Sequence, residues 1–556
     1  MAANIVPQKV EDVDTQALSP MMQQYLEIKR QHPNEILFYR VGDFYEMFFD
    51  DALTASRELE LTLTGKACGL PDRAPMCGVP FHSYEIYAAR LIAKGYKVAI
   101  CEQMEDPALA KGLVKRDIIR VITPGTVIES SMLADDKNNY ICSIYTRKVR
   151  SRWKAGICFA DISTGEAYAT ELTAEKMGPA IITELCRYMP SEILINPALL
   201  DLKEVTNYVR QHTHALVELR EDACYQQRVM EDAMTAQFGA DWRNTCGFAQ
   251  DGLVPYAFGA LLGYLHETQK HGIDRIKSVQ NYADAQYMRL SPVTRANLEL
   301  TETMRGREKR GTLLWVLDKT ETSMGKRQLR AWIEQPLVDS SVINQRLDAV
   351  EALYNANVTR ADLKEALSHV YDIERLTTRI LYGSATPKEV KALGDTCVYL
   401  PQVRQLARQC TTPLLQELSG AVDPLEDLLN LINRALVEDP PANLKDGGAI
   451  RAGFNAEVDE LRDIMHGGKG FLSQLEAKLK KETGIPKLKI GFNKVFGYYI
   501  EVSRSYAASV PDTFIRKQTL TTGERYITPE LKELENKILG ANERLLVLEH
   551  QLFADL

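Results

Sequence analysis

Short apolar runs alternate with polar residues and turn signals over roughly the first 125 residues, a pattern that predicts a mixed α/β region. Strands are expected at 36–41, 97–103 and 117–123, and helices at 48–59 and 84–94. The dipeptide Pro124-Gly125 is a strong break signal and closes the region. We therefore predict a first domain over residues 1–125.

The pattern changes from residue 139 onward to a series of strand-like segments. ICSIYT, WKAGICFADI and GEAYATEL follow one another, and a helical pattern near 174–188 and a strand at 192–195 come after them. This order predicts a second α/β domain over residues 126–255.

Helical periodicity dominates beyond about residue 255. Leucine-rich stretches with this spacing lie at 255–271, 325–334, 343–357, 361–381 and 413–437. They predict an all-α scaffold over residues 256–440.

The last segment carries an unbroken apolar seam with spacings of three and four residues. The seam consists of Leu531, Leu534, Ile538, Ala541, Leu545, Leu548 and Leu552. Such spacing places the residues along one face of a long helix, which needs a helical partner. We assign a returning helix to 521–556 and expect its partner within the chain.

A small β insert is predicted between helical segments. In GIPKLKIGFNKVFGYYIEVSRS (484–505), apolar residues alternate with others in two short strands around 491–497. We assign this insert to residues 441–520. The predicted fold class is therefore a multidomain α/β plus all-α protein, with two α/β domains followed by a long helical domain that contains a small β insert.

Composition supports several globular domains. The chain has 556 residues, whereas single cores stop growing at about 250–300 residues. Its content of 45% hydrophobic and 26% charged residues is ordinary for globular proteins. The longest nearly apolar run, at 254–265, is shorter than the roughly 20 residues that span a membrane. The N-terminus lacks a signal-peptide pattern, so a soluble, intracellular protein is expected.

Ten cysteines are scattered without any CxxC pair. This usage is typical of reduced core thiols, and we expect no structural metal.

Charge gives a local signal only. The net charge of −8 does not indicate a nucleic-acid binder, but residues 466–520 contain ten lysines and arginines against four acidic residues. A basic segment in an acidic chain fits an electrostatic footprint for phosphates, and it fits a solvated helix face equally well.

The segment FYRVGDFYEMFFDDA (38–52) offers candidate chemistry. We predict a turn at Gly42-Asp43 and the start of a helix at Phe44–Glu46. Phe44 is then either one more core aromatic or an apolar wedge that enters a step between base pairs, with Glu46 hydrogen-bonding a base edge. A carboxylate facing DNA is costly unless it contacts a base rather than a phosphate.

Distinctive long segments are spread over essentially the whole chain. They are GDFYEMFFDDA (42–52), APMCGVPFHSYEIYAARLIAKGYKVAICEQMEDP (74–107), RVITPGTV (120–127), FADISTGE (159–166), MRLSPVTRANLELTE (288–302), GTLLWVLDKTETSMGKRQLRAWIEQPL (311–337), GFNKVFGYYIEVSRS (491–505) and QTLTTGERYITPELKELENKI (518–538). In sequence and in order, these segments closely resemble the MutS family of mismatch-repair proteins.

The resemblance implies a mismatch-recognition domain, an RNase H-like connector, a helical core with levers, and a clamp inserted between the levers. Phe44 and Glu46 occupy the positions whose side chains stack on and hydrogen-bond a mispaired or unpaired base in the family. The clamp is expected to supply sequence-independent phosphate contacts. Its candidate residues are Lys487, Lys489, Asn493, Lys494 and Arg504.

Family members also carry a nucleotide-binding domain with a GxxxxGK[ST] loop, and this sequence contains no such motif; Gly325-Lys326, for example, is followed by Arg327. We expect ATP and Mg²⁺ to bind only in a further domain of a longer polypeptide, and this chain, which stops in mid-heptad as a fragment would, not to hydrolyse ATP. The resemblance further implies a homodimer in the full-length form, a MutL-type partner, and a cytoplasmic, nucleoid-associated location.

Two other functions were weighed. In an RNase H-like nuclease, Asp161 at a strand end could bind metal together with Glu166 and Glu184, although two-metal chemistry needs more converging carboxylates. A paralogue that binds DNA junctions without sensing mismatches is disfavoured by the intact Phe44–Glu46 motif. The lone pair His212 and His214 receives no role.

Overall fold

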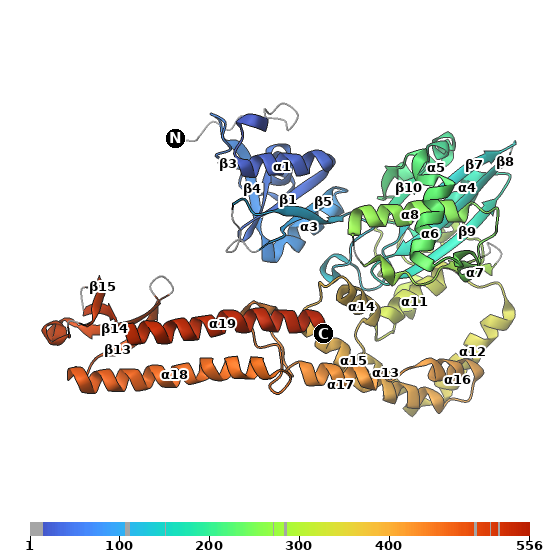
Figure 1. Ribbon diagram of the computed structural model, residues 1–556. Coiled ribbons are helices and arrows are strands. Elements are labelled where there is room, and N and C mark those ends of the chain that lie inside the picture. Colours follow the sequence, from blue (N-terminus) through green and yellow to red (C-terminus); the bar gives the residue numbers. More distant parts are fainter. Residues whose placement is uncertain are drawn as a thin grey trace. The chain divides into compact units, whose positions relative to one another are not determined.

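The computed structural model describes residues 15–105, 112–150, 152–270, 272–282, 286–493, 497–511, 513–520 and 523–556. The chain divides into two compact units (Figure 1). The first comprises Met1–Ser384 and Gln402–Ala421, and the second comprises Ala385–Pro401 and Val422–Leu556.

The first unit begins with a six-stranded sheet in the order β3-β4-β2-β1-β5-β6. Its strands are β1 Glu35–Val41, β2 Phe44–Phe48, β3 Thr64–Lys66, β4 Ala74–Pro80, β5 Lys97–Gln103 and β6 Arg116–Ile122. Helix α1 (Pro20–Gln31) packs on one face, and α2 (Phe49–Leu59) and α3 (Tyr84–Ala93) pack mainly on the other. Strands β1, β2, β4, β5 and β6 therefore contribute alternate side chains to two cores, one on each face of the sheet. The strands and helices predicted for this region are confirmed, with one exception.

The exception is the segment after the Gly42-Asp43 turn. Phe44–Glu46 was predicted to start a helix, but these residues begin β2, which pairs antiparallel with β1 through the register Val41↔Phe44. Two residues thus make the hairpin turn, and Gly42 has a φ of +57°, as such tight turns require. The helix starts only at Phe49.

A second six-stranded sheet follows, in the order β11-β10-β7-β8-β9-β12. Its strands are β7 Ile141–Val149, β8 Arg152–Asp161, β9 Glu166–Thr173, β10 Glu192–Ile195, β11 Leu216–Leu219 and β12 Gln280–Asn281. Helices α4 (Met177–Tyr188) and α5 (Lys203–His212) cover one face, and α6 (Gln227–Phe238), α7 (Trp242–Cys246) and α8 (Val254–Gln269) cover the other.

The position of α8 differs from the prediction. The sequence pattern at 255–271 was grouped with the later all-α scaffold, yet α8 packs against β7 and β8 as part of the second α/β domain. This helix is apolar on nearly all sides because it is buried between the sheet and α6.

The later part of the chain is helical as predicted, although two of the predicted helices are each split. The helices are α9 Pro292–Asn297, α10 Leu313–Leu317, α11 Ser323–Glu334, α12 Ser340–Asn355, α13 Asn357–Ser368, α14 Ile373–Leu381, α15 Pro387–Arg408, α16 Pro413–Ala421 and α17 Glu426–Ala435. No helix in the described parts of the chain is both long and apolar enough to cross a membrane. All ten cysteines are free.

In the second unit, two long helices lie side by side (Figure 1), α18 (Ala456–Thr483) and α19 (Pro529–Asp555). They run antiparallel, since Arg462 pairs with Glu549 and Lys478 pairs with Glu530. The seam predicted for the last helix is confirmed, and α18 is its partner within the chain: Leu531, Ile538, Ala541 and Leu545 are buried.

The β insert between these helices is larger than predicted. It is a four-stranded antiparallel sheet in the order β13-β14-β16-β15. Its strands are β13 Lys489–Asn493, β14 Gly497–Ser503, β15 Ile515–Thr519 and β16 Gly523–Ile527. Residues 523–527, which were assigned to the returning helix, therefore form a strand.

Candidate nucleic-acid interface

Phe44 differs from the other aromatic residues of its segment in being exposed. Its side chain is 48% exposed at the start of β2, whereas Phe38, Tyr39, Phe48 and Phe49 are fully buried. Interpreting Phe44 as a core residue is therefore wrong. A large apolar side chain left open at the tip of a hairpin is available to insert into another molecule.

The strand conformation also aligns the two candidate residues. Side chains at i and i+2 of a strand point to the same face, so Phe44, Glu46 and Phe48 share one face of β2 while Tyr45 and Met47 enter the core on the other. In a helix, by contrast, Phe44 and Glu46 would point in nearly opposite directions. The observed geometry lets one ligand touch both side chains.

The tip of this hairpin is braced from its sides. The Phe81 amide donates to the Asp43 carbonyl at 3.0 Å, and the Arg40 guanidinium lies 3.6 Å from the centre of the Phe81 ring. Arg40 also pairs with Glu102 at 3.2 Å, and the Tyr45 hydroxyl donates to the same carboxylate. Burial and the nearby Glu102 charge hold the pKa of Tyr45 well above its ordinary value, so this hydroxyl stays a donor. The contacts fix the position from which Phe44 projects.

Glu46 has a partner that the sequence did not indicate. Lys66, from β3, donates to the Oε2 atom of Glu46, and its ammonium lies 5.5 Å from the centre of the Phe48 ring. Across the β2–β4 ladder Glu46 faces Gly78. Lys66 is therefore the side chain that fixes one oxygen of Glu46.

The basic candidates of the β insert fall into two groups. Lys487, Lys489 and Arg504 are exposed, and the register Lys489↔Glu501 places the start of β13 beside the end of β14, just before Arg504. Asn493 lies at the opposite end of β13, paired with Gly497. Lys494 falls outside the described residues. The structure thus brings three of the candidates to one end of the sheet and separates Asn493 from them.

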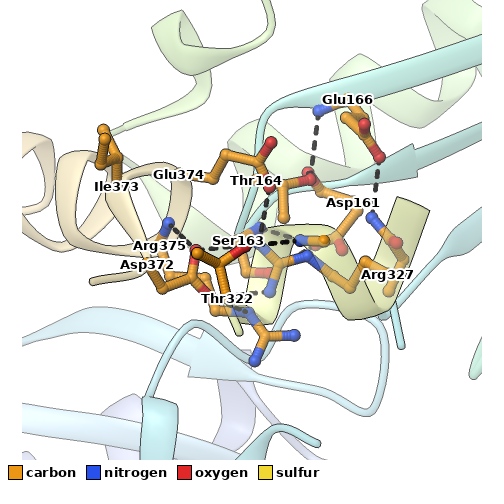
Figure 2. Close-up of polar contacts among 12 residues, drawn as sticks. Asp161, Ser163, Thr164, Glu166, Thr322, Arg327, Asp372, Ile373, Glu374 and Arg375 are labelled. Carbon is orange, nitrogen blue, oxygen red and sulfur yellow. Dashed lines mark hydrogen bonds and ion pairs between the residues drawn. The ribbon is translucent and has the colours of Figure 1, made fainter. Parts of the chain in front are cut away.

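The Asp161 carboxylate, a candidate metal ligand in a nuclease, accepts hydrogen bonds from residues of the turn that follows it and from Asn139. Asp161 is fully buried at the end of β8. Its Oδ1 accepts from the amide and hydroxyl of Ser163 at 2.9 and 2.7 Å, and its Oδ2 accepts from the Asn139 amide at 3.0 Å. Figure 2 shows Asp161 and Ser163 beside the charged residues of α11 and α14. These bonds make Asp161 a structural cap for the β8–β9 turn.

Glu166 and Glu184 are engaged elsewhere. Glu166 accepts from the Asn138 side chain at 2.8 Å, while Glu184 pairs with Arg187 at 3.0 Å and accepts from the Tyr282 hydroxyl at 2.6 Å. Burial, followed by the charges of Glu374 and Asp161, raises the pKa of Glu166 to about 7. Among the described residues, no group of three or more His, Cys, Asp or Glu side chains could hold a metal ion.

The charges next to Glu166 are paired across α11 and α14 (Figure 2). Arg327 forms a two-pronged pair with Asp372 at 2.7 and 2.8 Å and reaches Glu374 at 2.6 Å. Arg375 donates to the Lys137 carbonyl at 3.0 Å. This network ties the segment before the second sheet to the helical region of the same unit.

The two histidines of the H-x-H motif do not converge. The His212 ring stacks on Tyr208 with centroids 5.0 Å apart, whereas the His214 Nε2 lies 3.4 Å from Arg307. They therefore make separate local contacts.

Comparison with known families gives three matches in succession. The model of MutS domain I matches residues 19–131, that of MutS domain II matches 139–280, and that of MutS domain III matches 293–556. The first two ranges correspond to the two six-stranded sheets, and α8 falls within the second.

Similar curated proteins include three that are named DNA mismatch repair protein MutS. The DNA mismatch repair protein MutS of Ruminiclostridium cellulolyticum is 48% identical over 539 residues, and that of Acetivibrio thermocellus is 49% identical over 539 residues; each alignment covers 97% of this chain and 61% of the relative. The MutS of Lachnoclostridium phytofermentans is 46% identical over 543 residues, or 57% of its length. The chain thus spans about three fifths of these relatives.

Proposed function

Since this chain belongs to the MutS family, we propose that it binds mispaired or unpaired bases in duplex DNA and so provides the recognition step of DNA mismatch repair. The observation that carries this proposal is the exposed Phe44 ring on a braced hairpin, with Glu46 on the same face of the strand. Phe44 is the wedge, and Glu46 contacts the edge of the base that the wedge displaces.

Physical selection follows from the stiffness of DNA. Inserting a side chain between base pairs costs a few kcal/mol of unstacking per step. A mismatched or unpaired base is already poorly stacked, so the same wedge enters there at lower cost. Discrimination then needs no reading of the surrounding sequence, which suits a protein that must find errors anywhere.

The test is competitive binding of this chain to a duplex with one G·T mismatch or one unpaired T against the matched duplex. Wild type should prefer the mismatched duplex, and Phe44→Ala should bind both alike, because base–aromatic stacking is worth about 1–3 kcal/mol. Ile86→Ala is the matched control, since Ile86 is also an exposed apolar residue of the first domain, at 64%, but lies on α3, which packs mainly on the other face of the sheet from Phe44 and Glu46.

Equal loss of preference in both variants would contradict the wedge role of Phe44. Equal binding of the two duplexes by wild type would contradict mismatch recognition by this chain.

We propose that Lys487, Lys489 and Arg504 contact DNA phosphates, with Asn493 and Lys494 as further candidates at the other end of β13. Three exposed cations at one end of the sheet support this assignment. Replacing all three with Gln should weaken binding to matched and mismatched duplexes by the same factor. It should also lower the slope of log affinity against log salt by about 0.9 per lost contact. A selective loss of mismatch binding would contradict this role.

For the complete polypeptide we propose the family's architecture and cycle. The sheet order β9-β8-β7-β10-β11, with three antiparallel strands and two parallel ones, supports an RNase H-like connector. The long pair α18 and α19 supports levers that carry the β insert as a clamp. ATP with Mg²⁺, homodimerisation and a MutL-type partner belong to the longer protein in this proposal.

A further inference from the structure

We propose that Lys66 is a positioning residue for mismatch recognition: it holds the Glu46 carboxylate over the β2–β4 ladder, neutralises its charge, and leaves one oxygen open to the DNA. This inference rests on the proposed function and extends it to a residue 20 positions away in the sequence.

Two contacts and partial burial define the position of this pair. Lys66 donates to Glu46 Oε2, and its ammonium lies 5.5 Å from the Phe48 ring centre, so the lysine crosses Phe48 to reach Glu46. Gly78 faces Glu46 across the β2–β4 ladder. The side chains of Glu46 and Lys66 are 16% and 28% exposed, respectively. The pair is thus partly shielded, which strengthens its attraction relative to a pair on the open surface.

The two oxygens of Glu46 are unequal. Among the described residues, only Oε2 has a hydrogen-bond donor, namely Lys66, so Oε1 is available to accept from a base N–H. A lone carboxylate near the duplex would be repelled by the phosphates. With Lys66 attached, the pair has no net charge and can approach a base edge beside the inserted Phe44 ring.

Lys66 therefore differs from a lysine that simply binds phosphate. A phosphate contact adds affinity for any duplex and increases the salt dependence. A lysine that acts through Glu46 changes the ratio of mismatched to matched affinity and leaves binding to matched DNA nearly unchanged.

The experiment is a double-mutant cycle on this chain, with Lys66→Met, Glu46→Gln and the double variant, each tested by G·T competition at several salt concentrations. If Lys66 acts through Glu46, each single variant loses about tenfold in mismatch preference, as one charged hydrogen bond implies, and the double variant loses no more than Glu46→Gln alone. Lys66→Arg restores most of the preference, because it keeps the positive charge. The salt slope of binding to the matched duplex stays that of the wild type in every variant.

Lys94→Met is the matched control, because Lys94 also pairs with a carboxylate of the first domain, Glu58, at 2.9 Å, but lies away from β2. It should leave the preference unchanged. Additive losses in the cycle, or an equal weakening of both duplexes with a lower salt slope, would overturn the proposal and make Lys66 a phosphate ligand.

A second measurement separates this proposal from the proposed function. The same cycle is followed without DNA by hydrogen exchange in the peptides that contain β2 and β3. Coupling between Lys66 and Glu46 there, together with no mismatch preference in wild type, would refute mismatch recognition while the pair stands. No coupling in the free protein, together with intact wild-type preference, would refute the pair alone.

Discussion

The two six-stranded sheets of the first unit both carry acidic side chains at or near strand ends, yet they use them in opposite ways. In the first sheet, β2 begins at the tip of a hairpin, where Phe44 is exposed. Lys66 binds one oxygen of the Glu46 carboxylate, and the other oxygen has no donor among the described residues. In the second sheet, both oxygens of Asp161 are taken by its own turn, and Glu166 faces the paired charges of α11 and α14. The two strand ends thus differ in what lies against them. Charged residues of α11 and α14 lie beside the second strand end, whereas the first carries the exposed Phe44 ring.

The lesson concerns how acidic residues at strand ends are interpreted. Asp161 and Glu166 resemble candidate metal ligands in the sequence alone, but their hydrogen bonds stabilise the β8–β9 turn and the segment before β7. In the sequence Glu46 is one acid among several, and only the structure shows that it shares a face of β2 with the exposed Phe44 and pairs with Lys66.

The largest expected change in stability comes from a substitution within β2. Phe48→Ala should destabilise the first domain by about 3–5 kcal/mol, because it empties a fully buried site whose ring packs 5.0 Å from Tyr25. Phe44→Ala should change the free energy of unfolding of the first domain by less than about 0.5 kcal/mol. Hydrogen exchange in peptides covering β1 and β2 measures both locally, which suits a multidomain chain. Similar losses in the two variants would place Phe44 in the core.

A middle-sized effect is expected at the closed strand end. Asp161→Ala leaves the Ser163 and Asn139 amides without their acceptor, which should destabilise the second sheet by about 1–3 kcal/mol. Mismatch preference should be unchanged. The same exchange measurement on β7 and β8 tests the first expectation, and G·T competition tests the second. If Asp161→Ala lost mismatch preference and kept the stability of the second sheet, Asp161 would have a role in binding, and the contrast between the two sheets would be wrong.

A third effect concerns the pH dependence of stability. Glu166 releases its proton at about pH 7 in the folded chain and near its ordinary value of 4.5 when unfolded. The folded state therefore holds the extra proton between these values, and stability falls as pH rises from about 4.5 to about 7. Glu166→Gln removes this dependence, so it should match wild type near pH 4.5 and exceed it at pH 8. Urea unfolding at both pH values measures the difference, and a constant difference would exclude Glu166 as its source.

Periodicity predicted β1, β5 and β6 of the first sheet, β7 to β10 of the second, and the apolar seam of α19, because each of these has a face that must be buried. It gave no prediction for β3, β4, β11 or β12. It failed at Phe44–Glu46, where apolar residues on both faces of β2 hide the alternation. The two-residue Gly42-Asp43 turn was the available signal for a hairpin. It also missed β15 and β16, whose sequences IRKQT and GERYI are rich in charged and polar residues.

The contact between Lys66 and Glu46 could not be predicted from spacing. It depends on β4 lying between β2 and β3, which local patterns do not specify. The partner of α19 was expected within the chain, but only the structure identifies it as α18. An apolar seam shows that one face of a helix must be buried, and it does not specify which helix buries it.

The two-residue length of the turn between β1 and β2 also governs which genetic changes the site tolerates. Alternate residues of a strand face opposite sides, so one codon inserted or deleted between Gly42 and Phe44 would reverse the parity of the strand if its pairing with β4 slid along. Tyr45 and Met47 would then take the open side, and Phe44 and Glu46 would be driven into the core. We expect natural variants to change the residue types in this turn and to keep its length of two residues. Insertions and deletions should instead occur in loops that do not set the register of a strand pair.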